Sequence, residues 1–352
     1  MASFTRCFRY LCPFVLFGIG YLAFTKTGLY CWGPLLFMFA FIPLAELFLQ
    51  PDPINLSEAE EQIAKSNPMY DFLLWAIVPA HIAMLYLFFI SFSQSNLSFL
   101  DRLGRIIGMG LLCGAFGINV GHELGHRIKP FEQFLAKTLL LTSLYMHFFI
   151  EHNKGHHKHV ATPLDPSSAS YNQNLYSFWI QTFIGTQREA WKIAIDEARK
   201  KKHNLPWLFN EMVLFQVIQI TFLSCILFSF GFTIMCFFIA SALLGAGLLE
   251  TVNYIEHYGL RRKEVKEHLF ERVQPAHSWN SNHILGRLML FELSRHSDHH
   301  YLAARKYQVL RHFDDAPQMP TGYPGMIILA LIPPLWFRVM HEQMRKYSLL
   351  PQ

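Results

Sequence analysis

The segment Val120–Arg127 reads VGHELGHR and contains the pattern His-Glu-x-x-His. His122 and His126 are four residues apart, so on a helix both imidazoles lie on one face and can bind one metal ion. In zinc proteases this pattern supplies two zinc ligands, and its glutamate, here Glu123, acts as the general base. Taken alone, the segment is compatible with a zinc protease.

Two more groups of histidines have ligand spacing. His152 and His156 are again four residues apart, and His157 points about 100° further round the helix. The third group occupies relative positions i, i+3 and i+4, and a single histidine stands in NYIEHYG after the last long apolar segment. The nine candidate metal ligands are His122, His126, His152, His156, His157, His257, His296, His299 and His300.

Nine imidazoles are more than one metal ion needs. A zinc ion takes three or four protein ligands, so the set suits two ions. Imidazole binds zinc, iron, copper and nickel alike, and iron with open coordination positions is the natural choice where oxygen is activated. A zinc protease would leave seven of the nine histidines without a role. A metal transporter would place ionisable residues near the middle of membrane spans, whereas these groups lie at the ends of apolar segments.

Polar residues beside the histidine groups are expected to support the ligands. A histidine ligand commonly donates its second N–H to a carboxylate, which fixes its tautomer and orientation, and we expect this role in preference to metal ligation. The supporting candidates are Glu123, Glu151, Glu256 and Asp298, with His159, His277 and His283 as further supporting groups or as substitutes for His257. Histidines without partners at ligand spacing are His81, His147, His203, His268, His312 and His341.

The composition is that of a membrane protein. Only 16% of the residues are charged, against about a quarter in soluble proteins, and 52% are hydrophobic. The apolar residues gather in blocks near the length that a helix needs to cross a bilayer. A net charge of +5 gives no argument for nucleic-acid binding. Six cysteines without a C-x-x-C pair encode no zinc ribbon and make a disulfide framework improbable.

We therefore expect one all-α integral membrane domain over residues 1–352, with six transmembrane helices and a cytoplasmic helical cap that holds the metal centre. An interfacial helix is predicted at 134–150, because a crossing helix of this length would separate the first two histidine groups by roughly 25 Å. Basic residues place the histidine-bearing regions 122–205 and 253–315 in the cytoplasm. The predicted spans are about 10–27, 29–49, 72–92, 104–122, 212–230 and 232–252.

The sequence segments around the histidines resemble those of the membrane-bound alkane 1-monooxygenases, which belong to the wider group of membrane desaturases and hydroxylases with three histidine boxes. The resemblance implies a non-haem diiron centre held by the nine histidines, which hydroxylates the terminal methyl group of an alkane with O2. One departure is visible, since Leu302-Ala303-Ala304 follow Tyr301 where the family tends to have Pro-Thr. The matching segments are GHELGHR, EHNKGHHKHVAT, NYIEHYGL, HSWNSNH, RHSDHHY and MPTGYPGM.

The resemblance also implies external electron donors, rubredoxin and rubredoxin reductase, and a bacterial inner-membrane location with the site facing the cytoplasm. Rubredoxins are usually acidic, so the basic stretches Arg188–Lys202 and Arg261–Lys263 are the predicted docking surface. A fatty-acyl desaturase or hydroxylase and an aromatic-methyl monooxygenase of the same superfamily remain open alternatives. The candidate residues of a substrate slot are Met38, Phe39, Phe41 and Phe88.

Overall fold

Six long apolar helices dominate the structure. The computed structural model describes residues 5–94, 96–202 and 204–350. In this part of the chain six helices are long and apolar enough to cross a membrane, which confirms the predicted all-α integral membrane fold. The candidate spans are Arg6–Thr25, Gly28–Glu46, Met69–Ser91, Phe99–Gly125, Glu211–Phe230 and Phe232–His257.

Several spans join more than one kind of helix. The second and fourth spans each contain a π-helical turn, η3 and η4, and such turns are rare and often lie at functional sites. The components of the six spans are η1 (Arg6–Leu11), α2 (Phe14–Thr25), η2 (Gly28–Trp32), α3 (Gly33–Leu36), η3 (Phe37–Phe41), α4 (Ile42–Glu46), α6 (Met69–Ser91), α7 (Phe99–Leu112), η4 (Cys113–Ile118), α8 (Asn119–Gly125), α13 (Glu211–Phe230) and α14 (Phe232–His257).

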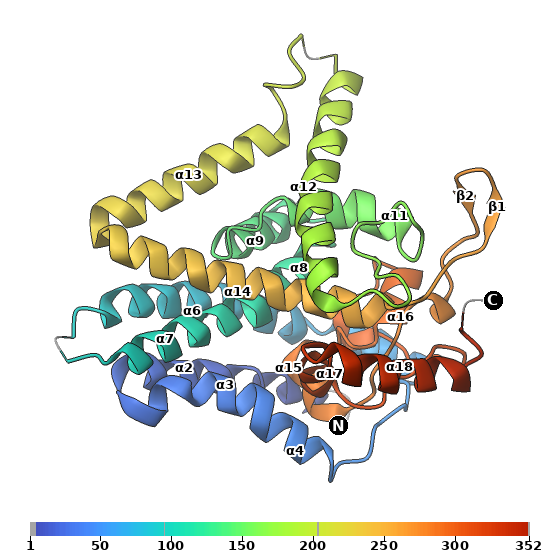
Figure 1. The fold of residues 1–352 in the computed structure, drawn as a ribbon, viewed down its shortest axis with the longest axis horizontal. Coiled ribbons are helices and arrows are strands. Elements are labelled where there is room, and N and C mark those ends of the chain that lie inside the picture. The colour runs from blue at the N-terminus through green and yellow to red at the C-terminus, as the bar shows by residue number, and fades with distance from the viewer. Residues whose placement is uncertain (1–4, 95, 203, 351–352) are drawn as a thin grey trace.

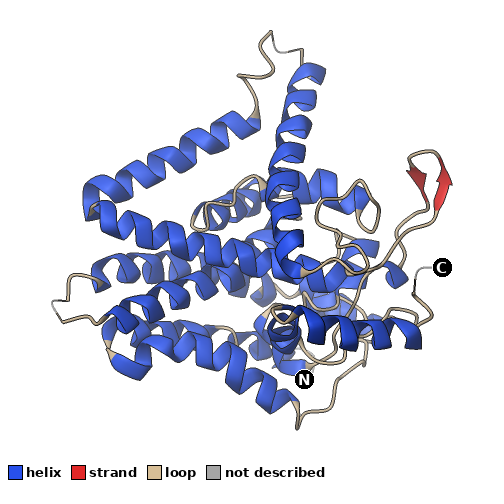
Figure 2. Ribbon diagram, in the orientation of Figure 1, coloured by secondary structure: helices blue, strands red, loops and turns tan. Residues whose placement is uncertain are grey.

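The other elements lie outside the spans, and Figure 1 shows most of them at the end of the bundle where the C-terminus lies. The only β-structure in the described ranges is one small antiparallel hairpin (Figure 2). These elements are α5 (Glu58–Ser66), α9 (Pro130–Leu141), α10 (Phe148–Glu151), η5 (His152–His156), α11 (His157–His159), α12 (Leu175–Lys200), β1 (Glu264–Lys266), β2 (Leu269–Phe270), η6 (Pro275–His277), α15 (Ile284–Met289), α16 (His296–Tyr301), η7 (Tyr307–Val309), α17 (Tyr323–Ala330) and α18 (Pro333–Lys346).

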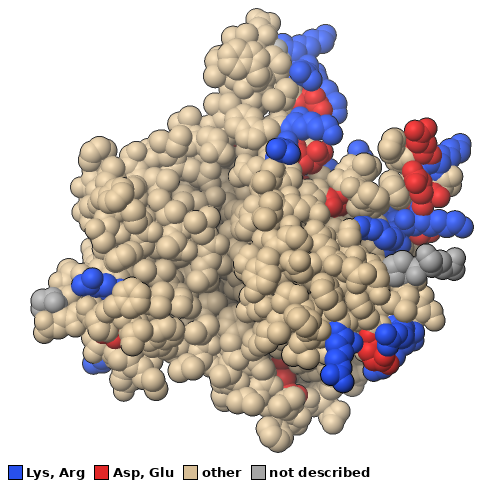
Figure 3. Space-filling model, viewed as in Figure 1, with Lys and Arg blue, Asp and Glu red and all other residues tan. Residues whose placement is uncertain are grey.

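Charge is distributed unevenly over this bundle. Helix α12 runs across the direction of α7 and α14 (Figure 1). Charged side chains gather along one side of α12 and around the adjoining end of the bundle, while the flanks of the spans carry few (Figure 3). Apolar flanks with a charged end are what a helical bundle needs when its sides face hydrocarbon and one end faces water.

The segment 134–150 is not one helix, which corrects the prediction. Helix α9 ends at Leu141 and α10 begins only at Phe148. In the turn between them the Oγ1 of Thr142 lies 2.9 Å from the Nε2 of His81, and Ser143 donates to the carbonyl of Cys113 at 3.3 Å. The Thr142 hydroxyl also donates to the carbonyl of Leu139 in α9 at 2.5 Å, so the two hydroxyl groups connect the end of α9 to two of the spans. The segment is not among the six candidate spans of the described chain.

Glycines allow α7 and α14 to approach closely, as small residues do between membrane helices. A Cβ atom added to Gly245 would lie 2.7 Å from the Cβ of Cys113 and 3.0 Å from the carbonyl oxygen of Gly110. Helix α8 continues from α7 through η4 and carries His122, while α14 ends at His257. The glycine contact therefore sets how far apart two of the histidine-bearing helices stand.

Replacing Gly245 with alanine should lower the unfolding temperature of the protein in detergent, because overpacking costs about 1–3 kcal/mol. Gly247 is the matched control, since it lies on the same helix and has nothing within 4 Å of an added Cβ. Gly247→Ala should be neutral or slightly stabilising. Circular dichroism melts of both variants test this, and equal melting temperatures would show that the close approach does not limit stability.

Candidate metal centre

The structure brings all nine candidate histidines together in two groups. In each group the potential ligand atoms lie within 4.8 Å of one another. We call these groups the first cluster and the second cluster. The first cluster is His122, His126, His152, His157 and His299, and the second cluster is His156, His257, His296 and His300.

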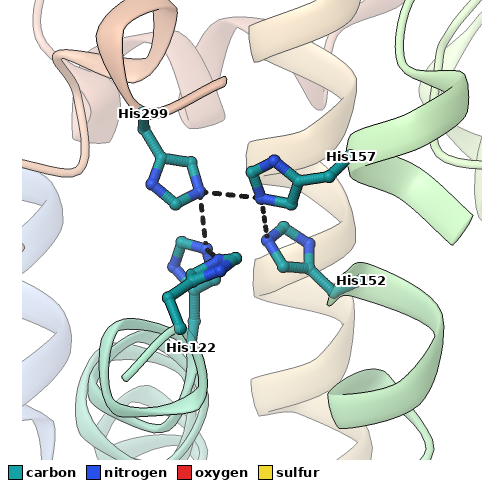
Figure 4. Close-up of side chains that lie close together, drawn as sticks. His122, His152, His157 and His299 are labelled. Carbon is teal, nitrogen blue, oxygen red and sulfur yellow. Dashed lines mark hydrogen bonds between the residues drawn. The ribbon is translucent and has the colours of Figure 1, made fainter. Parts of the chain in front are cut away.

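In the first cluster the imidazoles point their Nε2 atoms at one another (Figure 4). The Nε2 of His122 lies 2.9 Å from that of His299 and 3.0 Å from that of His126. The Nε2 of His157 lies 3.0 Å from that of His152 and 3.1 Å from that of His299. Side chains from α8, η5, α11 and α16 thus surround one small volume with nitrogen atoms.

The second cluster has the same character and is more deeply buried. The Nε2 of His296 lies 3.1 Å from that of His257 and 2.8 Å from that of His300. His156 completes the group, with its ring centroid 4.9 Å from those of His257 and His300. Its Nε2 is buried and has no hydrogen-bond partner within the described part of the protein, so this nitrogen is free to bind a metal ion.

The two clusters are neighbours. The rings of His157 and His300, one from each cluster, have centroids 4.5 Å apart. His156 and His157 follow one another in the chain and belong to different clusters, and the same holds for His299 and His300. Two pairs of consecutive residues thus link the clusters through the backbone.

The assignment of histidines to faces differs from the prediction in one place. Regular α-helical spacing places His152 and His156 on one face, but in the structure His152 shares the first cluster with His157. The reason is that His152–His156 forms the π-helical turn η5, in which residues five apart come to the same side. The π turn directs His156 to the second cluster.

Burial favours the neutral form of several ligand imidazoles. It lowers the pKa of His126 to about 3. A neutral imidazole presents a lone pair, which is the form that binds a metal ion. Burial first, and then neighbouring imidazoles, hold the pKa well below its ordinary value for His152, His157, His296, His299 and His300.

One supporting carboxylate was missed by the sequence analysis. Asp165 is buried, and one of its oxygens lies 3.0 Å from the Nδ1 of His156 and accepts from Ser168 at 2.5 Å. This contact places the His156 proton on Nδ1 and leaves Nε2 as the donor atom towards the cluster. Asp165 stands nine residues beyond His156 in an irregular segment, so its role depends on a tertiary fold that no spacing rule reveals.

Glu123 and Asp298 do not bind the histidines beside them, which corrects the prediction for both. Glu123 accepts from Arg127 at 2.6 Å, and Asp298 accepts from Arg305 at 2.8 Å. Consecutive residues on a helix point about 100° apart, so an acid next to an inward-facing histidine faces another part of the protein. In this structure Glu123 faces Arg127, and Asp298 faces Arg305.

The remaining supporting candidates behave in different ways. The Oε2 of Glu256 lies 3.2 Å from the Nε2 of His296. Glu151 is buried, and its Oε1 has no partner among the described residues. His283 lies 2.9 Å from the hydroxyl of Ser281 and joins neither cluster. The other described histidines outside both clusters are His81, His147, His159, His268, His277, His312 and His341, and His203 lies outside the described residues.

The segment HSWNSNH positions the helices that carry the second cluster. The indole of Trp279 donates to the carbonyl of Tyr258 at 2.9 Å, beside the end of α14. The side-chain oxygen of Asn280 accepts from the backbone N–H of Ser297 at 2.9 Å, at the start of α16. The conformation of this loop therefore fixes where His257 and the histidines of α16 meet.

An apolar cavity lies beside the clusters, between η3, η4, α14, α15 and α17. Met38 and Phe39, two of the four candidate slot residues, line it together with Asn119 and Tyr323. Its volume is about 40 Å³. This is far below a typical ligand pocket, so a bound chain needs the flexible side chains, Met38 among them, to move.

Phe41 and Phe88, the other two candidate slot residues, do not line this cavity. Phe41 is 57% exposed on the outside of the second span. Phe88 is buried in an aromatic cluster, with its ring 5.6 Å from that of Phe24 and 5.0 Å from that of Phe92. Aromatic composition alone does not distinguish a slot from helix packing.

Comparison with known proteins gives consistent matches. The model of the fatty acid desaturase family matches residues 103–330. Alkane 1-monooxygenase 2 of Pseudomonas aeruginosa is 41% identical over 88% of this chain and 83% of that protein. Alkane 1-monooxygenase 2 of Alcanivorax borkumensis is 39% identical over 90% of this chain and 84% of that protein. The hydroxylase component of the xylene/toluene monooxygenase of Pseudomonas putida is 30% identical over 68% of this chain and 64% of that protein.

The family match spans well over half of the chain, and the matches to the two alkane 1-monooxygenases cover 88% and 90% of it. The fold, with six candidate spans and two histidine clusters, agrees with this relationship. The chain therefore belongs to the alkane 1-monooxygenase family of membrane-bound oxidoreductases, within the wider fatty acid desaturase family.

Proposed function

We propose that this protein hydroxylates the terminal methyl group of alkanes to primary alcohols with O2 at a non-haem diiron centre. The observation that carries the proposal is the convergence of nine imidazoles in two adjacent clusters at one end of a membrane bundle. The relatives named alkane 1-monooxygenase support an alkane as the substrate.

The spacing of the Nε2 atoms supports iron over tetrahedral zinc. With metal–nitrogen bonds of about 2.1 Å, two ligands at a right angle lie about 3.0 Å apart, whereas two at the tetrahedral angle lie about 3.4 Å apart. The Nε2 atoms that are in direct contact within the clusters lie 2.8 to 3.1 Å apart. Five histidines in the first cluster also exceed the four ligands of a structural zinc site. The donor set thus fits an ion of higher coordination number.

Two bound irons would supply O2 activation, in which one oxygen atom enters the C–H bond and the other leaves as water, with consumption of two electrons and two protons. The protein's own residues bind the irons, orient the substrate and exclude water. In the cavity wall Tyr323 donates to Glu256 at 2.7 Å, and Glu256 in turn contacts His296. An alkane bound in this cavity, in contact with Met38 and Phe39, would therefore have one end directed towards the second cluster.

We infer that the metal centre faces the cytoplasm of a bacterial cell from the inner membrane. Lys and Arg are concentrated at the end of the bundle that holds the clusters, including the side of α12 visible in Figure 3. The positive-inside rule assigns such an end to the cytoplasm. In this arrangement a substrate dissolved in the bilayer would enter between the spans. Soluble reductants would approach the metal centre from the cytoplasm.

We propose rubredoxin, supplied by rubredoxin reductase, as the electron donor. A surface cavity of about 410 Å³ is lined by Arg188, Lys192 and Arg261 and reaches Asp165. Asp165 is hydrogen-bonded to His156, so this cavity offers a short route from the surface to the second cluster. A small acidic protein would find complementary charge there. The basic residues Arg199–Lys202 lie at the end of α12 and just beyond it, and would steer the donor protein from a greater distance.

Oxidation of aromatic methyl groups is the second candidate function. The similarity to the xylene/toluene monooxygenase component favours it over acyl-chain desaturation. Both reactions would use the same clusters, so only the product distinguishes them.

Purified protein should contain two irons per chain and, with rubredoxin, reductase and NADH, convert alkanes into primary alcohols. His299→Ala should lose iron and turnover, while His312→Ala, a variant outside both clusters, should keep them. Metal analysis measures the iron content, and gas chromatography identifies the products. Two irons with benzylic alcohols from toluene or xylene as the sole products would select the second candidate, and zinc without oxygen consumption would contradict both.

Asp165→Asn should weaken metal binding in the second cluster by about 10–100-fold, as expected when a carboxylate no longer orients a histidine ligand. Metal titration of the metal-free protein measures this affinity. Asp298→Asn is the comparison, because Asp298 binds Arg305 and no histidine. If both variants bind metal equally, Asp165 does not orient His156.

The double variant Arg188→Glu with Lys192→Glu should raise the KM for rubredoxin several-fold at low salt and much less at high salt, because salt screens exposed charges. Reversing Lys200, Lys201 and Lys202 together should slow donor-supported turnover less, since these residues lie away from the Asp165 cavity. Steady-state kinetics at two ionic strengths measure both effects. Unchanged kinetics in both variants would remove α12 from the docking surface.

A further inference from the structure

A groove lies between the end of α12 and the start of α13. Figure 1 shows these two helix ends joined by a loop at the edge of the molecule. The groove has a volume of about 790 Å³, which is in the range of ligand pockets, and the proposed reaction does not use it. Its polar lining residues are Glu197, Lys201, Asn210 and Glu211, and its other lining residues are apolar.

The charged groups around this groove leave an excess of positive charge. Its two acids are already paired, Glu197 with Lys154 and Glu211 with Lys137, each at 2.7 Å. In the described ranges no carboxylate forms an ion pair with the lysines Lys200–Lys202, the middle one of which lines the groove. A ligand in the groove therefore meets ammonium groups without a countercharge, and this favours an anionic ligand.

The apolar part of the groove belongs to the outer surface of a membrane span. Leu214 and Val217 line it from α13, which is a candidate span, and each is 55% exposed. In the loop before α13, Trp207 and Phe209 are 61% and 58% exposed. Exposed aromatic residues beside the end of a span are typical of the level where lipid headgroups meet hydrocarbon. The groove therefore lies where a lipid molecule has both its phosphate and the start of its acyl chains.

We propose that this groove binds one anionic phospholipid from the membrane leaflet on the side of the metal centre. Its phosphate lies beside Lys201, and an acyl chain packs along Leu214 and Val217. Basic residues next to a span attract anionic headgroups, and the apolar wall removes part of the chain from other surroundings. A zwitterionic lipid would fill the apolar part and leave the lysines without a countercharge.

The lipid site is separate from the cavity proposed for donor docking. That cavity is lined from α12 by Arg188 and Lys192 and reaches Asp165, whereas Lys201 lines only the groove. Lys192 is paired with Glu189 at 3.5 Å. Lys192 thus provides a matched control, a lysine of the same helix that lies outside the groove.

Native mass spectrometry of the protein in detergent, titrated with phosphatidylglycerol or with phosphatidylcholine of the same acyl chains, measures this binding. The wild type should bind phosphatidylglycerol more tightly. Lys201→Gln should weaken that binding about five-fold, as expected for one basic residue near an anionic lipid, and Lys192→Gln should not. Equal affinity of the wild type for the two lipids, or equal effects of the two variants, would overturn the proposal.

A second pair of variants tests the apolar wall without changing the charge. Val217→Trp fills the groove and should weaken the binding of phosphatidylglycerol. Ile220→Trp should leave it unchanged, because Ile220 is 62% exposed on the same helix and lies outside the groove. Circular dichroism melts show whether each variant is folded. Equal binding by both variants would contradict a lipid in the groove.

Two further measurements distinguish the lipid from other occupants. Glycerol phosphate, which has the charge but no acyl chain, should not displace phosphatidylglycerol at equal concentration. Displacement would identify a site for free phosphate groups and overturn the proposal. If Lys201→Gln raises the KM for rubredoxin and leaves lipid binding unchanged, Lys201 serves donor docking and the lipid site is ruled out.

Discussion

The crowding of imidazole nitrogens is the interaction on which this structure depends. Neighbouring Nε2 atoms in both clusters lie about as close as hydrogen-bonded atoms, yet neutral imidazoles have too few protons to bond to all their neighbours. Lone pairs that face one another repel unless a cation lies between them. Several helices must therefore hold the rings in place, and they meet where their ends converge. The helical bundle holds in place a small group of imidazoles that would otherwise repel one another.

The membrane imposes a second constraint, because hydrocarbon offers no partners to backbone N–H and C=O groups. Continuous helices satisfy these groups internally, and the six spans follow this rule. The spans depart from α-helical geometry in the 3-10 segments η1 and η2 and in the π-helical turns η3 and η4, and a further π turn, η5, carries ligands. Each π turn changes the rotation of the helix that follows it. The positions of the ligands therefore depend on local departures from ideal geometry as much as on the helices themselves.

The fold and most of the site were predictable from sequence because their signals are periodic or compositional. Apolar blocks identify the spans, and repeated i, i+4 spacing identifies the histidines. The division of His152, His156 and His157 between clusters was not predictable, because it depends on a π turn whose cause lies in packing. Asp165 reaches His156 only through tertiary structure. Likewise, Glu123 faces Arg127 instead of a histidine because of helix geometry, which adjacency in sequence does not reveal.

The consecutive histidine pairs that divide between the clusters have a consequence for how the centre is assembled. His156 and His157 share one peptide bond, as do His299 and His300, and each pair contributes one ring to each cluster. A metal ion that settles in one cluster orders the backbone of both pairs and so presents two rings of the other cluster in their final orientation. Binding of the first metal ion therefore reduces the conformational entropy that is lost when the second ion binds. We therefore expect the two sites to fill cooperatively, with little accumulation of singly loaded protein.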